Sequence, residues 1–175
     1  VRIDDHRPAS AASPTASGGV VQHDVLEFRR AGLGLYSTIK GPDQPTYGIE
    51  DAAIPVENLQ YYVHEVLETV KRLNTRLVIY GHASVGVLHI KPLLDLKTTE
   101  GVRKYEQINR AVFQLVRKYG GSWSGEHGDG LVRSGENREL FGDTLYEAFR
   151  EVKRAFDPDW LMNPGKIVDS PPMSE

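Results

Sequence analysis

The sequence predicts an α+β domain in which an antiparallel sheet carries its helices on one face. Two long segments have apolar residues at helical spacing, and two β-rich runs are separated by only two residues. So short a connection joins antiparallel strands, because parallel neighbours need a crossover of about a dozen residues or more. A helix with one apolar side must bury it, so we expect the helices to pack on the same face of the sheet.

Three segments have the apolar spacing of amphipathic helices. Residues 57–73 and 99–119 place apolar side chains three and four residues apart, which gathers them on one side of a helix. The glycines of Gly120-Gly121 are expected to end the second helix. The third helix ends before Asp157-Pro158, because the residue preceding a proline disfavours helical backbone. Its apolar positions are Leu145, Phe149, Val152 and Phe156.

Shorter runs rich in β-branched and aromatic residues predict the strands. Residues 76–82 and 85–92 form the expected hairpin. Two further strands are predicted at residues 33–40 and at residues 51–55. A short helix over residues 21–30, closed by Gly32, is expected to precede them.

The length of 175 residues suits one domain. Residues 1–20 are predicted to form a flexible linker or loop, since small residues and two prolines bury little apolar surface. Residues 21–168 form the expected folded domain, and residues 169–175 form a frayed tail. The chain starts at Val1 rather than at a methionine, so we interpret it as a piece of a longer protein.

Composition and charge argue against several classes of function. With 21 Lys and Arg against 24 Asp and Glu, the formal net charge is −3. Such a charge disfavours a nucleic-acid partner and an electrostatic membrane anchor. No apolar run approaches the roughly 20 residues of a membrane-spanning helix, and the first residues lack the apolar core of a signal peptide. We expect a cytoplasmic protein, associated with a membrane only through a partner.

The chain contains no cysteine. Disulfides, thiolate catalysis, iron–sulfur ligation and cysteine-type zinc sites are therefore excluded within these residues. A metal site here must use histidine and carboxylate ligands.

Two histidines on the predicted hairpin are the first candidates for such ligands. His82 ends one strand and His89 lies within the next, so a tight turn brings the two imidazoles side by side. Neutral imidazole binds zinc, manganese or iron well. The alternative is a pair of ordinary hydrogen-bonded histidines, and the spacing of these two residues alone favours that interpretation.

A glycine-rich segment, residues 125–130, holds a carboxylate beside an imidazole. Glycines permit close approach by a ligand, and three of them among six residues suggest a functional loop. Glu126 is a candidate third metal ligand; two histidines and one glutamate with open positions are typical of catalytic metal sites. His127 would then be free to act as a base. The alternative is a turn whose charged residues face water.

Three motifs carry a resemblance to a known family. Along the chain they are residues 81–89, residues 125–128 and residues 161–166. They resemble the C-terminal domain of FAD-linked oxidases, which are flavoproteins of the vanillyl-alcohol-oxidase type and include D-lactate, glycolate-oxidase-subunit and D-2-hydroxyglutarate dehydrogenases. The resemblance covers residues 25–168 and is strongest to large bacterial fusions with an iron–sulfur module. It implies a ferredoxin-like cap domain, C-terminal to the FAD-binding domain of a larger flavoprotein.

The resemblance also implies a role for each site residue. The family's metal ligands fall on His82, His89 and Glu126, and its active-site histidine falls on His127. We expect this histidine to take a proton from the substrate, since its unperturbed pKa lies near neutrality.

Cofactor and substrate contacts follow in the same way. The family's asparagine near the cofactor falls on Asn163, and the loop at Gly128 is expected to line the flavin. The arginine that grips the substrate carboxylate falls on Arg29, with Leu26 where the family has tryptophan. Lys91 stands where some hydroxyglutarate enzymes have asparagine, and we expect it to be a second substrate anchor.

The function that the resemblance implies is oxidation of a D-2-hydroxy acid, of lactate, glycolate or 2-hydroxyglutarate type, by hydride transfer to flavin. Its cofactors are FAD, held mostly by a domain outside these residues, and a divalent metal, with zinc the first choice. An iron–sulfur cluster elsewhere in the full-length protein, and an electron-accepting protein or quinone, complete the expected partners.

The residues leave two alternatives open. The chain could be a non-catalytic cap or binding module that has lost its metal site. It could also be a separate metallohydrolase with two histidines and one glutamate, although the chain has no His-Glu-x-x-His helix and that interpretation leaves the Asn163 motif unexplained.

Overall fold

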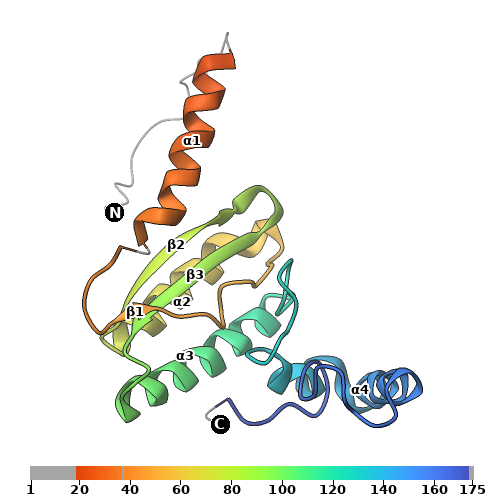
Figure 1. The fold of residues 1–175 in the computed structure, drawn as a ribbon. Helices are drawn as coiled ribbons and strands as arrows, with labels where there is room; N and C mark the ends of the chain where they lie inside the picture. Colours follow the sequence, from red (N-terminus) through yellow and green to blue (C-terminus); the bar gives the residue numbers. More distant parts are fainter. Residues whose placement is uncertain (1–18, 37, 174–175) are drawn as a thin grey trace. The chain divides into compact units, whose positions relative to one another are not determined.

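The computed structural model describes residues 19–36 and 38–173 (Figure 1). It divides the chain into two compact units, residues 1–39 and residues 40–175. The first unit contains helix α1, Gly19–Tyr36. The linker predicted for residues 1–20 lies almost entirely outside the described residues.

Helix α1 corrects two predictions. It extends well beyond the short helix expected at residues 21–30, and the strand predicted at residues 33–40 is wrong because the helix continues to Tyr36. Gly32 does not end it. One glycine lowers helix propensity by about 1 kcal/mol without removing a backbone hydrogen bond, so it is a weak stop signal inside a favourable segment.

The second unit is built on an antiparallel sheet of three strands. They are β1, Gln44–Pro45, β2, Arg76–His82, and β3, Val87–Leu94, in the order β1-β3-β2. The predicted hairpin is confirmed as β2 and β3. A single 3-10 turn, Ala83–Val85, joins the two strands and ends at Gly86, whose φ is +78°.

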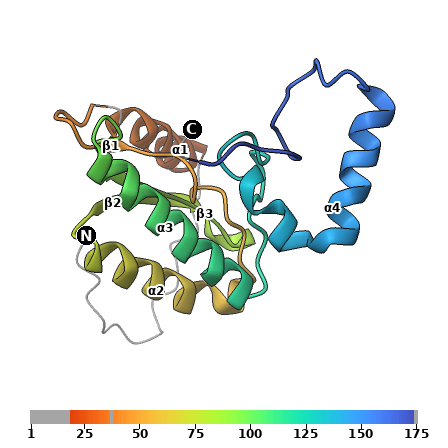
Figure 2. The same ribbon diagram turned by 90° about the horizontal axis from the view of Figure 1, so that it is seen from below.

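Helices α2, Leu59–Arg72, and α3, Thr99–Lys118, lie side by side along one face of the sheet (Figures 1 and 2). Both confirm the predicted helices to within two residues. The Thr98 side chain caps α3 by accepting a hydrogen bond from the Gly101 amide. Between helices and sheet lies one apolar core, formed mainly by Tyr62, Val66, Val70, Leu88, Ile90, Leu94, Ile108, Val112, Val116 and Trp123.

The segment beside β3 is interrupted rather than continuous. Pro45 pairs with Leu93, and Ala53 next forms a bridge with Val87. The segment takes eight residues to cover what β3 covers in six, so two extra residues bulge away from the sheet. The strand predicted at residues 51–55 is therefore wrong, since within it only Ala53 pairs. We call residues 46–52 the bulge.

Ala53 also forms a bridge with Ser122, on the side away from β3. The positions across the sheet are then the segment at Ser122, the interrupted first strand, β3 and β2. This is the order of a ferredoxin-like sheet whose last strand is reduced to a single bridge.

Helix α4, Asn137–Phe156, ends before Asp157 as predicted. Gly142, with φ +78° and ψ +164°, divides it into two helical pieces. Three of its predicted apolar positions, Leu145, Val152 and Phe156, are exposed rather than in the core. Among the described residues, no helix combines the length and apolar character needed to cross a membrane.

Candidate metal and catalytic site

The hairpin holds its two histidines on the face of β3 opposite the core. His89 is 5% exposed, and its ring centroid lies 5.3 Å from that of His82, with the two ring planes at 87°. His89 Nδ1 lies 2.7 Å from the Glu50 carbonyl oxygen in the bulge. A carbonyl only accepts, so Nδ1 carries the proton and Nε2 keeps its lone pair.

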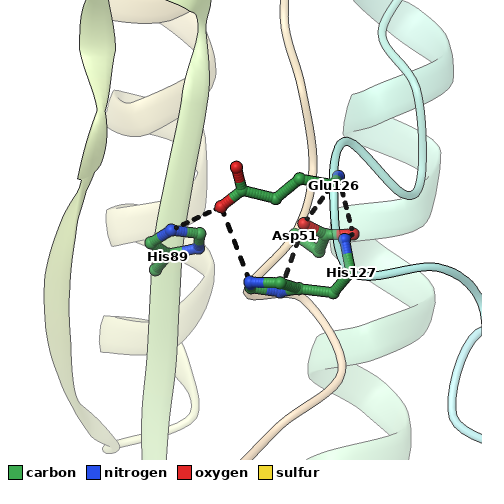
Figure 3. A group of neighbouring side chains, drawn as sticks. All are labelled: Asp51, His89, Glu126 and His127. Atoms are coloured by element: carbon green, nitrogen blue, oxygen red, sulfur yellow. Dashed lines mark hydrogen bonds and ion pairs between the residues drawn. The ribbon is translucent and has the colours of Figure 1, made fainter.

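Glu126 brings a carboxylate from the glycine-rich loop to the imidazole of His89 (Figure 3) and to that of His82. Its Oε1 lies 3.1 Å from His89 Nε2, 3.4 Å from His82 Nε2 and 3.5 Å from His127 Nε2. In a tetrahedral site with metal–ligand bonds of about 2.1 Å, ligand atoms are roughly 3.4 Å apart. The carboxylate oxygen of Glu126 thus lies near this separation from each of the two predicted histidine ligands.

Asp51, from the bulge, anchors the start of the same loop. Its side chain is completely buried and accepts hydrogen bonds from Ser124 Oγ at 2.6 Å and from the backbone amides of Gly125, Glu126 and His127 at 2.9 to 3.1 Å. Burial raises the pKa of Asp51, but the hydrogen bonds from the Ser124 hydroxyl and from the backbone amides of His127 and Glu126 outweigh it, so the pKa is lowered. Asp51 is therefore a fixed anion at neutral pH.

Glu50 holds the next part of the loop through Arg133. The Arg133 Nη1 lies 2.9 Å from Glu50 Oε1, and both side chains are buried. The same guanidinium donates to the carbonyl oxygens of Gly128, at 2.6 Å, and Gly48, at 3.2 Å. One buried ion pair therefore ties the backbone of the loop to the bulge.

Comparison with known proteins identifies the fold that carries this site. The family model "FAD linked oxidases, C-terminal domain" matches residues 8–167. The chain belongs to this family.

Curated relatives of this chain are dehydrogenases and an oxidase subunit. A D-2-hydroxyglutarate dehydrogenase of Haemophilus influenzae is 38% identical over 143 residues, which are 82% of this chain and 14% of the relative. A D-lactate dehydrogenase of Archaeoglobus fulgidus is 36% identical, covering 67% of this chain and 26% of the relative. The glycolate oxidase subunit GlcD of Bacillus subtilis is 28% identical, with 82% and 30% covered. The oxidase domain thus spans less than a third of each of these relatives.

Lys91, predicted as a substrate anchor, lies two residues from His89 on the same face of β3. Its side chain is buried, with Nζ 4.2 Å from the ring centroid of Tyr47 and 5.7 Å from that of Tyr80. An ammonium group is attracted to the face of an aromatic ring. The strand therefore places a positive charge near the hairpin histidines.

The geometry of the cluster does not test the roles predicted for Arg29, Gly128 and Asn163. Arg29 is exposed on α1, in the other unit of the oxidase domain, so its role stays a prediction. Gly128, at φ +81°, has open space around it. Asn163, at φ +46°, is exposed and accepts a hydrogen bond from Lys166. The cofactor contacts assigned to Gly128 and Asn163 likewise stay predictions.

The supporting roles of Glu50, Asp51 and Arg133 were not predicted from the sequence. A signal was present, because two adjacent carboxylates stand inside the apolar run from Ile49 to Ile54. Charged residues are rarely buried unless they are paired. Two carboxylates in an apolar run therefore indicate that each one binds a hydrogen-bond donor or a cation.

Proposed function

We propose that this domain binds the substrate and a divalent metal in an FAD-dependent oxidoreductase that oxidises a D-2-hydroxy acid of lactate, glycolate or 2-hydroxyglutarate type. One observation carries the proposal: Nε2 atoms of two hairpin histidines converge on Glu126 Oε1, with His127 beside them. The names of the relatives supply the substrate class. The activity belongs to the complete flavoprotein, of which this domain is one part.

Two sets of ligands compete for the metal. One consists of His82, His89 and Glu126; the other consists of Asp51, His89, Glu126 and His127, whose ligand atoms all lie within 4.8 Å of one another. Asp51 is a poor ligand because its oxygens already accept four hydrogen bonds. We therefore exclude it from the coordination sphere.

Ring orientation distinguishes the histidines. The lone pair of an imidazole nitrogen lies in the ring plane. The rings of His89 and His127 are stacked, 5.0 Å apart at 19°, so their lone pairs run in separate planes. The rings of His82 and His89 are nearly perpendicular, which allows both lone pairs to meet at one ion. This favours His82, His89 and Glu126 as ligands and leaves His127 as the base.

The residues of the domain then have distinct tasks. Arg29 and Lys91 hold the substrate carboxylate by charge, and His127 Nε2 accepts the proton of the substrate hydroxyl. The loop at Gly128 and the segment at Asn163 form one wall of the flavin site.

The two absent groups supply the remaining chemistry. A bound divalent ion, zinc by the preference for two histidines and a carboxylate, would lower the pKa of the substrate hydroxyl as a Lewis acid. FAD, held mainly by another domain of the same polypeptide, is the acceptor of the hydride. We expect a protein or quinone to take the electrons onward.

Two variants of the complete flavoprotein test this assignment. Glu126→Gln keeps the side-chain size but removes its charge, so metal affinity should fall by at least 10- to 100-fold together with turnover. His127→Asn should keep the metal and slow flavin reduction by about 10²- to 10⁴-fold. Metal analysis and anaerobic flavin bleaching with D-lactate, glycolate and D-2-hydroxyglutarate give the two readings.

Glu57→Gln and His64→Asn are matched controls, because both side chains are exposed and lie on or before α2, outside the described cluster. They should leave both readings unchanged. If His127→Asn loses the metal while Glu126→Gln keeps it, ligand and base are exchanged. If both site variants reduce flavin at the parent rate, the domain is a non-catalytic binding module.

A further inference from the structure

The His127 ring has carboxylates on both of its nitrogen sides. Nδ1 lies 3.3 Å from Asp51 Oδ1, and Nε2 lies 3.5 Å from Glu126 Oε1 (Figure 3). Nδ1 also lies 3.8 Å from Glu50 Oε1. Glu50 is already paired with Arg133, which offsets its charge. Asp51 is therefore the nearer and less neutralised of the two groups facing Nδ1.

Asp51 cannot turn away from this ring. Its buried carboxylate is held by the Ser124 hydroxyl and by three consecutive backbone amides, including that of His127 itself. Rotation would break all of these part-buried hydrogen bonds together, each of which contributes about 0.5–1.5 kcal/mol. The direction of the charge toward Nδ1 is thus built into the loop.

A neutral imidazole carries one N–H, and a neighbouring carboxylate decides which nitrogen bears it. With an anion fixed beside Nδ1, the proton resides on Nδ1 and the lone pair on Nε2. Nε2 is the nitrogen that lies beside Glu126 Oε1, the same oxygen that is near His82 Nε2 and His89 Nε2. A base for the substrate hydroxyl needs its lone pair on that side.

We propose that Asp51 is a positioning residue, which fixes both the tautomer and the ring direction of His127. The inference rests on the proposed role of His127 as the base. Asp51 acts through His127 and does not bind the metal or the substrate. The carboxylate that holds the backbone of the loop therefore also sets the protonated nitrogen and the orientation of the His127 ring.

Asp51→Asn separates these two tasks. The amide oxygen can still accept from Ser124 and the backbone amides, so the loop keeps most of its support. The amide NH₂, placed beside Nδ1, donates instead of accepting and moves the histidine proton to Nε2. Asparagine thus preserves the shape of the site and inverts the tautomer.

A double-mutant cycle in the complete flavoprotein tests this coupling. Asp51→Asn alone should slow flavin reduction by about 10²- to 10⁴-fold, the size of a lost base or of a wrongly protonated histidine. Bound metal should be retained, and the apparent Kd for D-2-hydroxyglutarate should change by less than about threefold. In the His127→Asn background, the same substitution should slow the reaction by less than about threefold.

Two further variants control for folding. Ser124→Ala removes a hydrogen bond to Asp51 Oδ2 but leaves Oδ1, the oxygen beside His127 Nδ1. The thermal transition of this variant should fall as in Asp51→Asn, while its rate falls much less. Asp51→Glu restores the negative charge and should recover at least about tenfold of the rate lost in Asp51→Asn. If the asparagine variant does not fold, Asp51→Glu takes its place in the double-mutant cycle with His127→Asn.

The outcomes distinguish the two proposals. If His127→Asn reduces flavin at the parent rate, the proposed function fails. If His127→Asn is slow but Asp51→Asn is fast, or slows both backgrounds by the same factor, only the positioning role is wrong and Asp51 is a structural clamp. Loss of metal in Asp51→Asn would instead make it a ligand.

Discussion

The hairpin and the glycine-rich loop position their site residues by different means. His89 is set by the register of two paired strands and is 5% exposed. Glu126 and His127 stand on a loop and have side chains 41% and 46% exposed, yet their backbone is held by the buried Asp51. Regular pairing directs one half of the site, and polar groups from a distant segment direct the other.

The bulge supports both halves. Its Glu50 carbonyl orients His89, its Asp51 carboxylate holds the loop, and its Glu50 side chain reaches the loop through Arg133. A defect in the bulge should therefore disturb both regions, whereas a defect in either region should stay local.

The largest effect is expected at His89, the most buried ligand. His89→Ala should reduce metal affinity by more than about 100-fold and abolish turnover, because a direct ligand counts for more than its supporting partners. His82→Ala, at the more exposed end of β2, should cost less. Zinc competition titration ranks the two, and equal losses would show that burial of the ligand adds nothing.

The buried ion pair comes next. Glu50→Gln leaves the Arg133 charge buried without its partner, which should lower the free energy of unfolding by about 3–5 kcal/mol. Glu139→Gln is the control, because Glu139 pairs with Arg110 and Arg117 at the surface, where pairs contribute about 0–1 kcal/mol. Urea unfolding measures both, and similar losses would contradict the importance assigned to the bulge.

Two glycines with positive φ sharpen the contrast between hairpin and loop. A Cβ on Gly86 would lie 1.9 Å from the Ile54 carbonyl oxygen, whereas a Cβ on Gly128 would meet no atom within 4 Å. Gly86→Ala should cost about 2–4 kcal/mol, from clash and strain together, and Gly128→Ala about 1 kcal/mol. Thermal unfolding compares them. The reverse order would mean that the loop is the stiffer region.

The smallest effect is expected at Lys91, on the hairpin but beside the proposed metal site. Lys91→Met removes the charge and keeps most of the length, so KM for the hydroxy acid should rise about tenfold, equal to roughly 1.4 kcal/mol, with kcat nearly unchanged. Steady-state kinetics decide it. A fall in kcat at constant KM would place Lys91 in the chemical step rather than in binding.

The parts of the fold that were predicted correctly depend on local patterns. The apolar stripes of α2 and α3 and the short connection between β2 and β3 are visible within about 20 residues of sequence, so periodicity predicts them. The wrong strand at residues 51–55 had a suitable composition. The two extra residues of the bulge prevent it from pairing continuously with β3, and no local pattern in the sequence reveals them.

The candidate site was predictable to the same extent. His82, His89, Glu126 and His127 lie in recognisable motifs, and the structure brings these four side chains together. Their supports do not follow from spacing, because Asp51 and the amide of His127 are 76 residues apart in the sequence. A contact over that distance is set by the packing of the whole sheet.

The interrupted first strand makes the domain a compromise between stability and function. Deleting two residues from the bulge would let the shortened segment between Gln44 and Ala53 pair with β3 without a break. This pairing would add backbone hydrogen bonds to the sheet. The same deletion would withdraw the carbonyl from His89 and the carboxylate from the loop together. A regular first strand would make the protein more stable, but His89 and His127 would lose the groups that orient their rings. The site therefore depends on the interruption of this strand.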